Sequence, residues 1–442
     1  MGINRNTTLP LLGRRAFLAS SAGAALSLGL GGKARASGTD AGVTITRERL
    51  DALAAAGYGV FNQNNALPPY DAARHAAQSD VQLYPLATYT QVPETGETVR
   101  VSGLLAVPAG VTGPIPVVSW QHGTILSFVQ VPSTTLKLAD PAYTMTDGVD
   151  STETLFNLHR FAARGYAVIA ADYLGKGPFR GNRPEAYAVK DASVSTCVSV
   201  LNAGLQLMKR LDLEPAELFL NGWSQGALNT QWLRQELQAT GVPVRAAAAA
   251  SPFNDLTEAF MFWTGGVMFP NPTPAPYPTG PIWLTLTTAI LLGSYEAYYR
   301  LDGLTRAAVR PEYHGALLKF WNDYALDFDA AKMPTPEKLL IDGFFERHTS
   351  EVASRFLRQL AANRATFFDY GSPMRLFYGL ADEAIHPMMA RLPLPAGGRF
   401  IDGVAVNNAS HRATFLASLY GAPETLQGKP NLPAWFDSLR GS

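Results

Sequence analysis

Short runs of consecutive apolar residues alternate with longer segments of helical periodicity along most of this chain. The runs at 117–120, 166–171 and 218–221 are hydrophobic at nearly every position, which is typical of strands buried on both faces. In chain order the pattern predicts strands at 82–91, 98–107, 117–120, 166–171, 218–221, 244–250, 374–378 and 400–406, and helices at 46–57, 155–165, 186–211 and 227–239.

This alternation of strands and helices predicts an α/β fold. Strands that are apolar on both faces need cover on both sides, so we expect a mostly parallel central sheet with helices on both faces. Right-handed crossovers then join successive parallel strands. Ligands of such sheets bind at the carboxyl ends of the strands, so polar residues directly after predicted strands are the first candidates for a site.

The alternation is interrupted between two predicted core strands. About 120 residues separate 244–250 from 374–378, far more than a simple crossover needs. The interruption is helical in pattern and rich in aromatic residues, and we interpret 252–372 as a helical cap or lid inserted over the site. The core would then comprise 37–251 and 373–442. A helical subdomain away from the site is the alternative.

The N-terminal segment has the pattern of an export signal. Arg14 and Arg15 precede Phe-Leu, a mildly apolar stretch follows to Leu30, and 34–36 reads Ala-Arg-Ala, an A-x-A cleavage site. Paired arginines of this kind resemble the bacterial twin-arginine signal, although Gly13 stands where Ser or Thr is usual. We therefore expect 1–36 to be removed and the protein to be exported to the periplasm or secreted.

Composition narrows the function further. Lys and Arg together number 36, as do Asp and Glu, without a basic run, so nucleic acid is not an expected partner.

Cys197 is the only cysteine, and an apolar helical pattern surrounds it, so we expect a buried thiol. The apolar stretch 281–292 is too short to span a bilayer. The scattered histidines lack metal-ligand spacing, and we expect neither a metal nor another cofactor.

The most informative motif is Gly222-Trp223-Ser224-Gln225-Gly226. It lies between a predicted strand and a predicted helix, and G-x-S-x-G in this position resembles the nucleophile elbow of α/β-hydrolases. Gly222 and Gly226 would allow the strand and the helix to approach closely. The tight turn would project Ser224 above the sheet, with the positive end of the helix dipole beneath it.

In that fold an acid and then a histidine follow the serine along the chain. Asp382 lies in the loop after strand 374–378 and is the expected acid, with Glu383 beside it and Asp402 as alternatives. His411, in a polar loop after the last strand, is the expected base. His386 is only four residues from Asp382, and we expect it to line the pocket or the surface.

Backbone amides are expected to form the oxyanion hole. Gln225 follows the nucleophile directly and supplies the first amide. The second should come from Gln121-His122-Gly123-Thr124 after strand 117–120, with Thr124 the first candidate and Gly123 the second. His122 is expected to shape this loop rather than to act as the base.

Four stretches of the chain resemble bacterial esterases and lipases of the α/β-hydrolase superfamily, near the secretory lipase group with a large helical cap. They are 121–124, 165–177, the elbow and 379–382. The resemblance implies a cofactor-free serine hydrolase of carboxylic esters. Asp172 and Tyr173 belong to its D-Y-x-G-x-G motif and would either line the pocket rim or brace the following turn. Gln225 and Ala227 stand where many relatives have glycine.

Other functions remain compatible with this pattern. A peptidase or amidase, or an acyltransferase, could use the same three residues, since one fold hosts many chemistries. A catalytically inactive fold used for binding would not need the serine, acid and histidine together. The aromatic cap favours medium-length apolar acyl chains, on either small-molecule or lipid esters.

Overall fold

The computed structural model describes residues 41–324, 333–346 and 350–441. The predicted export signal at 1–36 lies outside them. One mixed sheet organises the described chain, in the strand order β1-β2-β3-β5-β4-β6-β7-β8-β9. Its strands are β1 (Val43–Ile45), β2 (Val81–Val92), β3 (Glu97–Pro108), β4 (Pro114–Gln121), β5 (Ala167–Ala171), β6 (Glu214–Trp223), β7 (Ala246–Ala250), β8 (Met374–Gly379) and β9 (Ile401–Val406).

The sheet has an antiparallel edge and a parallel centre. Strands β1, β2 and β3 pair antiparallel, and β3 pairs antiparallel with β5. From β5 through β4, β6, β7 and β8 to β9 every pairing is parallel. The carboxyl ends of β4, β6, β7, β8 and β9 therefore meet at one edge of the sheet, where ligands of open α/β sheets bind.

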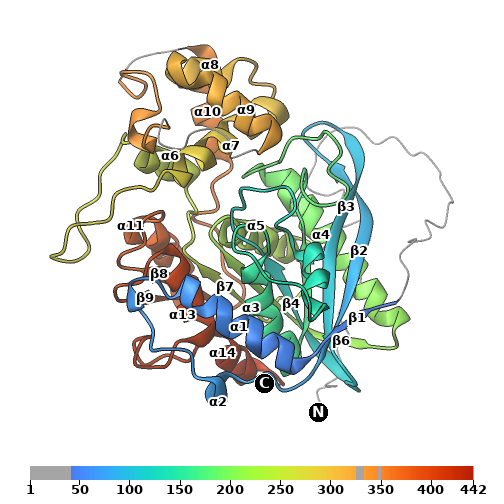
Figure 1. Ribbon diagram of the computed structural model, residues 1–442. Coiled ribbons are helices and arrows are strands. Elements are labelled where there is room, and N and C mark those ends of the chain that lie inside the picture. The colour runs from blue at the N-terminus through green and yellow to red at the C-terminus, as the bar shows by residue number, and fades with distance from the viewer. Residues whose placement is uncertain (1–40, 325–332, 347–349, 442) are drawn as a thin grey trace.

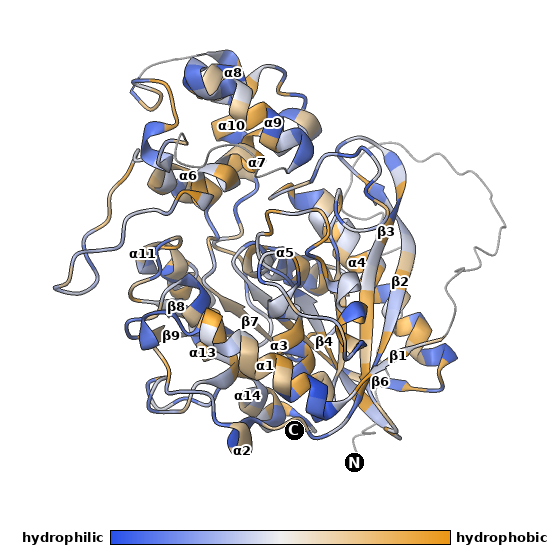
Figure 2. Cartoon of the chain, in the orientation of Figure 1, coloured by the Kyte–Doolittle hydropathy of each residue, from blue (hydrophilic) through white to orange (hydrophobic). Residues whose placement is uncertain are grey.

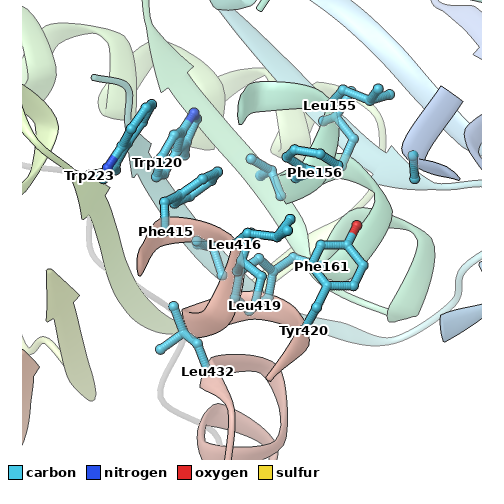
Figure 3. Packing of buried hydrophobic residues seen from close by; sticks show 14 of the residues in the cluster. Trp120, Leu155, Phe156, Phe161, Trp223, Phe415, Leu416, Leu419, Tyr420 and Leu432 are labelled. Atoms are coloured by element: carbon cyan, nitrogen blue, oxygen red, sulfur yellow. The ribbon is translucent and has the colours of Figure 1, made fainter. Parts of the chain in front are cut away.

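Helices cover both faces of this sheet, as predicted. Helices α1 (Arg47–Phe61), α3 (Thr152–Arg160), α13 (His411–Tyr420) and α14 (Leu432–Leu439) share one buried cluster with the strands. Figure 3 shows part of this cluster, in which Phe415 of α13 stacks on Trp120 and Trp223 and lies near Phe156 of α3. Helices α4 (Lys190–Arg210) and α5 (Gln225–Ala239) pack on the opposite face.

A group of helices lies between β7 and β8, in the segment where the strand alternation breaks. It contains α6 (Leu256–Trp263), α7 (Trp283–Tyr298), α8 (Leu304–Ala308), α9 (His314–Asp323) and α10 (Glu351–Ala362), which gather at the top of the view in Figure 1. They share an apolar cluster with core residues such as Tyr187 and Trp232. In Figure 2 the hydrophobic colour is prominent on α7.

Helix α7 contains most of the apolar stretch 281–292. Its residues from Leu284 to Tyr295 are buried, as expected of a helix within the protein. Among the described residues, no helix is both long and apolar enough to cross a membrane. The short helices α2 (Ala72–His75), α11 (Pro387–Arg391) and α12 (Leu394–Gly397) complete the α-helices of the described chain.

Helix α4 begins later than its hydrophobic pattern predicts. Helical periodicity starts near residue 186, but Ala188 has a φ of +52°, which no right-handed helix contains. The backbone before α4 is held instead by the helical group, since the Tyr187 N–H donates to Ser294 Oγ at 3.0 Å. Tertiary contacts therefore override the local helical preference at this end.

Candidate active site

Ser224 occupies a strained turn between β6 and α5. Its φ and ψ are 56° and −120°, a combination that costs a non-glycine residue roughly 1–3 kcal/mol and persists only where the surroundings impose it. The Ser224 N–H donates to Ala250 O at 2.9 Å, which fastens the turn to the end of β7. The sequence motif thus forms the strand-turn-helix geometry expected of it.

The two motif glycines permit this turn because a side chain has no room at either position. A Cβ on Gly222 would lie 2.2 Å from Gly226 O, and one on Gly226 would lie 1.9 Å from Gln121 O. Both obstacles are backbone atoms, which cannot swing aside. Close approach of β4, β6 and α5 at the turn therefore requires glycine at both positions.

His411 and Asp382 are joined directly. The imidazole Nδ1 lies 3.0 Å from Asp382 Oδ1 and 3.1 Å from Oδ2. Because a carboxylate only accepts hydrogen bonds, Nδ1 carries the proton in this pair and Nε2 is left as the basic nitrogen. Asp382 follows β8, and His411 opens α13 behind the N-cap Ser410.

Asp382 is fully buried and held by several donors. Ser251 Oγ donates to its Oδ2 at 2.6 Å, and the Ala384 and Ile385 amides donate to its Oδ1 at 3.0 and 2.8 Å. Each of these bonds compensates for the solvation that burial removes. They also fix the carboxylate in the position from which it meets His411.

The surroundings of His411 make it a stronger base than an ordinary histidine. Burial disfavours its charged form, but the adjacent Asp382 carboxylate, with a further contribution from Glu383, outweighs burial and raises the pKa of His411 above its usual 6.5. Glu383 also accepts the His411 backbone N–H at 2.9 Å. The Trp223 ring lies 5.0 Å from the imidazole, centroid to centroid.

Ser224 and His411 open into the same cavity. Its volume is about 490 Å³, within the usual range for a small-molecule site. Aromatic and apolar residues line it together with polar and charged ones: Phe61, Gln63, Thr124, Leu126, Gln130, Asp147, Gly148, Thr152, Glu153, Trp223, Ser224, Trp283, Glu383, His411 and Arg412. Arg412 pairs with Asp147 at 2.9 Å.

The predicted oxyanion donors lie in two segments of this cavity. Gln225 is the first residue of α5, where backbone N–H groups have no partner within the helix. Thr124 lines the cavity, and its hydroxyl lies 2.9 Å from the Tyr187 hydroxyl. The Gly123 N–H donates to Glu153 Oε2 at 2.8 Å, so this amide is already engaged.

His122, Asp172 and Tyr173 do not belong to the cavity lining, and all three are buried. The structure thus favours the bracing role over the pocket rim. Tyr173 stacks on the His122 ring at 4.0 Å between centroids and donates its hydroxyl to His122 O at 2.9 Å. Burial lowers the pKa of His122 to about 4, so it stays neutral and shapes the loop before Gly123.

Asp172 holds a second loop. Its Oδ2 accepts from the hydroxyls of Ser102 and Ser133, each at 2.5 Å. Its Oδ1 accepts the Ser133 N–H at 2.8 Å. The first residue of the D-Y-x-G-x-G motif therefore connects β3 to the segment after Val131.

Asp402, one of the two alternative acids, is engaged elsewhere, and His386 lines neither this cavity nor the surface, contrary to expectation. The Asp402 carboxylate pairs with Arg375 at 3.0 Å and with Lys429 at 3.0 Å. His386 is buried against Phe269, with ring centroids 4.9 Å apart, and burial lowers its pKa to about 4. Neither residue lines the cavity that contains Ser224.

Trp283 and Glu153 are two of the cavity residues that the sequence did not assign to the site. Trp283 comes from α7 in the helical group and lies 5.8 Å from the His411 ring, centroid to centroid. Glu153 lies in the first turn of α3, is only 4% exposed and lines the cavity. Acidic residues are common in first turns of helices, so nothing in the sequence distinguished Glu153 from an ordinary helix start.

Comparisons with known proteins identify the fold. No protein-family model and no curated protein matches the sequence. Among solved structures, the rice cell wall degrading esterase LipA from Xanthomonas oryzae has a TM-score of 0.66 at 18% identity, over 87% of this chain and 96% of that one. A Legionella pneumophila protein for which a hydrolase function has been suggested reaches 0.67 at 20% identity, over 90% and 96%.

Candida antarctica lipase A in its closed state is also similar, with a TM-score of 0.56 at 15% identity over 79% of this chain and 81% of that one. The chain therefore has the α/β-hydrolase fold and resembles esterases and lipases of that fold in structure. At these identities the likeness establishes the fold alone.

Proposed function

We propose that the protein is a serine hydrolase that cleaves carboxylic esters through an acyl-enzyme. The observation that carries the proposal is the arrangement of Ser224, His411 and Asp382. A serine on a strained elbow shares a cavity with a histidine whose Nδ1 meets a buried carboxylate. A nucleophile, a base and a group that orients the base are what acyl transfer by serine requires.

In the proposed reaction, Ser224 Oγ attacks the acyl carbon while His411 Nε2 takes its proton. Asp382 keeps the imidazole in the tautomer with Nδ1–H and stabilises the imidazolium that forms. The carbonyl oxygen acquires negative charge in the tetrahedral intermediate. Its collapse expels the alcohol, which receives the proton from His411, and leaves the acyl group on Ser224. Water activated by His411 then releases the acid.

The developing oxyanion would be stabilised by the backbone amides of Gln225 and Thr124. Gln225 opens α5, so the positive end of the helix dipole adds to its N–H. Thr124 lines the same cavity from the loop after β4. Removing one such donor typically lowers kcat by roughly 100- to 1,000-fold.

The helical group at 252–372 is proposed to act as a cap over this site. Trp283 supports this role, because it reaches the cavity from α7 and lies beside His411. Together with Trp223 and Phe61 it gives the cavity an aromatic portion suited to a medium-length apolar acyl chain. Small-molecule and lipid esters both contain such chains.

Export through the segment 1–36 is a further part of the proposal. It is supported by the paired Arg14 and Arg15 and the Ala-Arg-Ala site. N-terminal sequencing of the protein recovered from a bacterial periplasm or culture medium tests it directly. A mature chain that starts at Ser37 is expected, and an intact Met1 in that fraction would contradict cleavage.

Hydrolysis of a p-nitrophenyl ester series from acetyl to palmitoyl tests the activity. The proposal expects activity that is lost in a folded Ser224→Ala protein, with the optimum at medium chain length. Equal activity in both proteins would show that Ser224 is not the nucleophile. Inactivity of both toward every ester would instead favour an amide substrate or acyl transfer, and a clear preference for acetyl over octanoyl would contradict the assigned chain length.

A further inference from the structure

Glu153 is a buried carboxyl group in the cavity that the proposed reaction does not use. It lies in the first turn of α3 and is 4% exposed, and it shares the cavity with Ser224 and His411. Burying a carboxyl group is costly unless its oxygens find partners. A buried acid beside a nucleophile therefore calls for a specific role.

Its contact is with the segment that carries the proposed oxyanion donor. Glu153 Oε2 accepts the Gly123 N–H at 2.8 Å. A Cβ on Gly123 would lie 3.2 Å from that same oxygen and 2.8 Å from the Trp223 ring. Gly123 therefore lies close to both the Glu153 carboxyl group and the ring of Trp223, the residue before Ser224.

The next residue is held by a second contact. The Thr124 hydroxyl lies 2.9 Å from the Tyr187 hydroxyl, and Tyr187 is fastened to α7 through Ser294. Neither this contact nor the one at Gly123 uses the Thr124 N–H. Adjacent peptide units share one Cα, so fixing the Gly123 N–H and the Thr124 side chain restricts the direction of the Thr124 N–H.

We infer that Glu153 is a positioning residue, which aims the Thr124 N–H at the oxyanion by holding the Gly123 N–H. The inference rests on the proposed function, because it concerns the orientation of an oxyanion donor that the proposed reaction uses. It deepens that function by adding a residue outside the serine, histidine and acid. Small errors in the placement of such donors matter, since their catalytic effect depends on orientation fixed before the reaction.

The electrostatics of Glu153 are compatible with this role. Burial raises its pKa to about 7, against smaller opposing effects of the Gly123 amide, Arg412 and His411. A carboxyl group that is partly neutral at pH 7 places less negative charge near a developing oxyanion than a full carboxylate would. Both forms retain an oxygen that accepts the Gly123 N–H.

Two substitutions of similar volume distinguish the effect of the hydrogen-bond acceptor of Glu153 from that of the rest of its side chain. Glu153→Gln retains a carbonyl oxygen that can accept from Gly123, whereas Glu153→Met cannot accept this bond. Each protein is compared with the wild type in kcat, KM, thermal unfolding and affinity for a trifluoromethyl ketone, whose adduct with a serine places an oxyanion in the hole.

The inference predicts that Glu153→Met lowers kcat by about 10- to 100-fold, weakens the trifluoromethyl ketone by a similar factor and leaves KM within about twofold. Glu153→Gln should stay within about threefold in all of them. A loss confined to KM or to thermal stability would overturn the inference, as would equal kcat values for the two variants.

If the Glu153→Met protein does not fold, Glu153→Gln alone decides: kcat close to the wild type supports the acceptor role, and a fall of tenfold or more contradicts it. Failure of the proposed function gives a different result. A wild-type protein without Ser224-dependent esterase activity overturns the function itself, whereas the variants at Glu153 are judged only against activity that Ser224→Ala abolishes.

Discussion

The Tyr277 hydroxyl, from the segment between α6 and α7, donates to the backbone carbonyl of Asp382. Trp263 Nε1 donates to the carbonyl of Ala384 at 2.8 Å in the same loop. The loop that carries the proposed catalytic acid is therefore held by two side chains of the helical group. The group reaches the site in two ways, through Trp283 in the cavity and through the support of Asp382.

Tyr277→Phe tests this support. One hydrogen bond contributes about 0.5–1.5 kcal/mol to the stability of the arrangement that it holds. A fall in kcat of about 2- to 10-fold is therefore expected if this bond holds Asp382 in its working position. Tyr298→Phe is the matched control, because its hydroxyl also donates to a backbone carbonyl, that of Pro184 at 2.8 Å, far from this loop in sequence. Equal effects of both changes on kcat would show that Tyr277 has no particular role at the acid loop.

Asp382→Asn should change both the rate and its dependence on pH. The carboxylate raises the pKa of His411, and the proposed reaction requires neutral His411, so the wild-type rate should rise with pH through a midpoint above 6.5. Without the carboxylate that midpoint moves to lower pH, and kcat falls by roughly 10³- to 10⁴-fold because the imidazole loses its orienting partner.

Asp402→Asn is the control for that experiment, since Asp402 pairs with Arg375 and Lys429 rather than with a histidine. The pH profile of kcat/KM should keep its midpoint in this variant. A midpoint that shifts in the Asp402→Asn protein but not in the Asp382→Asn protein would assign the role of the acid to Asp402 instead.

Glu153→Gln should affect stability in a pH-dependent manner. The pKa of Glu153 rises from 4.5 to about 7 on burial, so the folded state disfavours its ionised form. The wild type therefore loses free energy of unfolding as the pH rises from about 4.5 through 7, by about 3 kcal/mol in total. Glutamine does not ionise and lacks this loss.

Urea unfolding of both proteins at pH 5 and pH 8 measures the effect. The difference in free energy of unfolding should move in favour of Glu153→Gln as the pH rises. Glu424→Gln, at an exposed carboxylate, serves as the control and should show no comparable trend. A difference that stays constant between pH 5 and pH 8 would refute the buried ionisation.

Gly226→Ala should prevent formation of the elbow. The new Cβ would meet Gln121 O at 1.9 Å, and a backbone carbonyl of β4 cannot move without displacing the segment before Thr124. We expect loss of activity together with a lowered melting temperature. Gly59→Ala, a helical position of α1 with nothing within 4 Å of the added Cβ, should be neutral or slightly stabilising.

Much of the fold could be predicted because the central parallel strands contain short apolar runs that alternate with segments of clear helical periodicity. Strand β1 was missed, since three residues, Val43–Ile45, are too few to show a period. The later start of α4 was also unforeseen, because it depends on the contact between Tyr187 and Ser294, more than 100 positions apart.

The sequence proposed single site residues where a motif fixes their position, and it left alternatives where only proximity could decide. Asp382 and Glu383 are neighbours, and the sequence could not assign their partners. In the structure Asp382 meets the His411 ring, whereas Glu383 meets its backbone N–H. Glu153 could not be predicted at all, because its partner Gly123 is 30 positions away and no pattern connects them.

The most direct test of the central claim is covalent labelling with a fluorophosphonate, followed by intact mass and peptide mapping. We predict one adduct per chain, located on Ser224, that is absent in Ser224→Ala and forms far more slowly in His411→Ala. An adduct on another residue, or the same labelling rate in His411→Ala as in the wild type, would contradict the proposal that His411 activates Ser224 as the nucleophile.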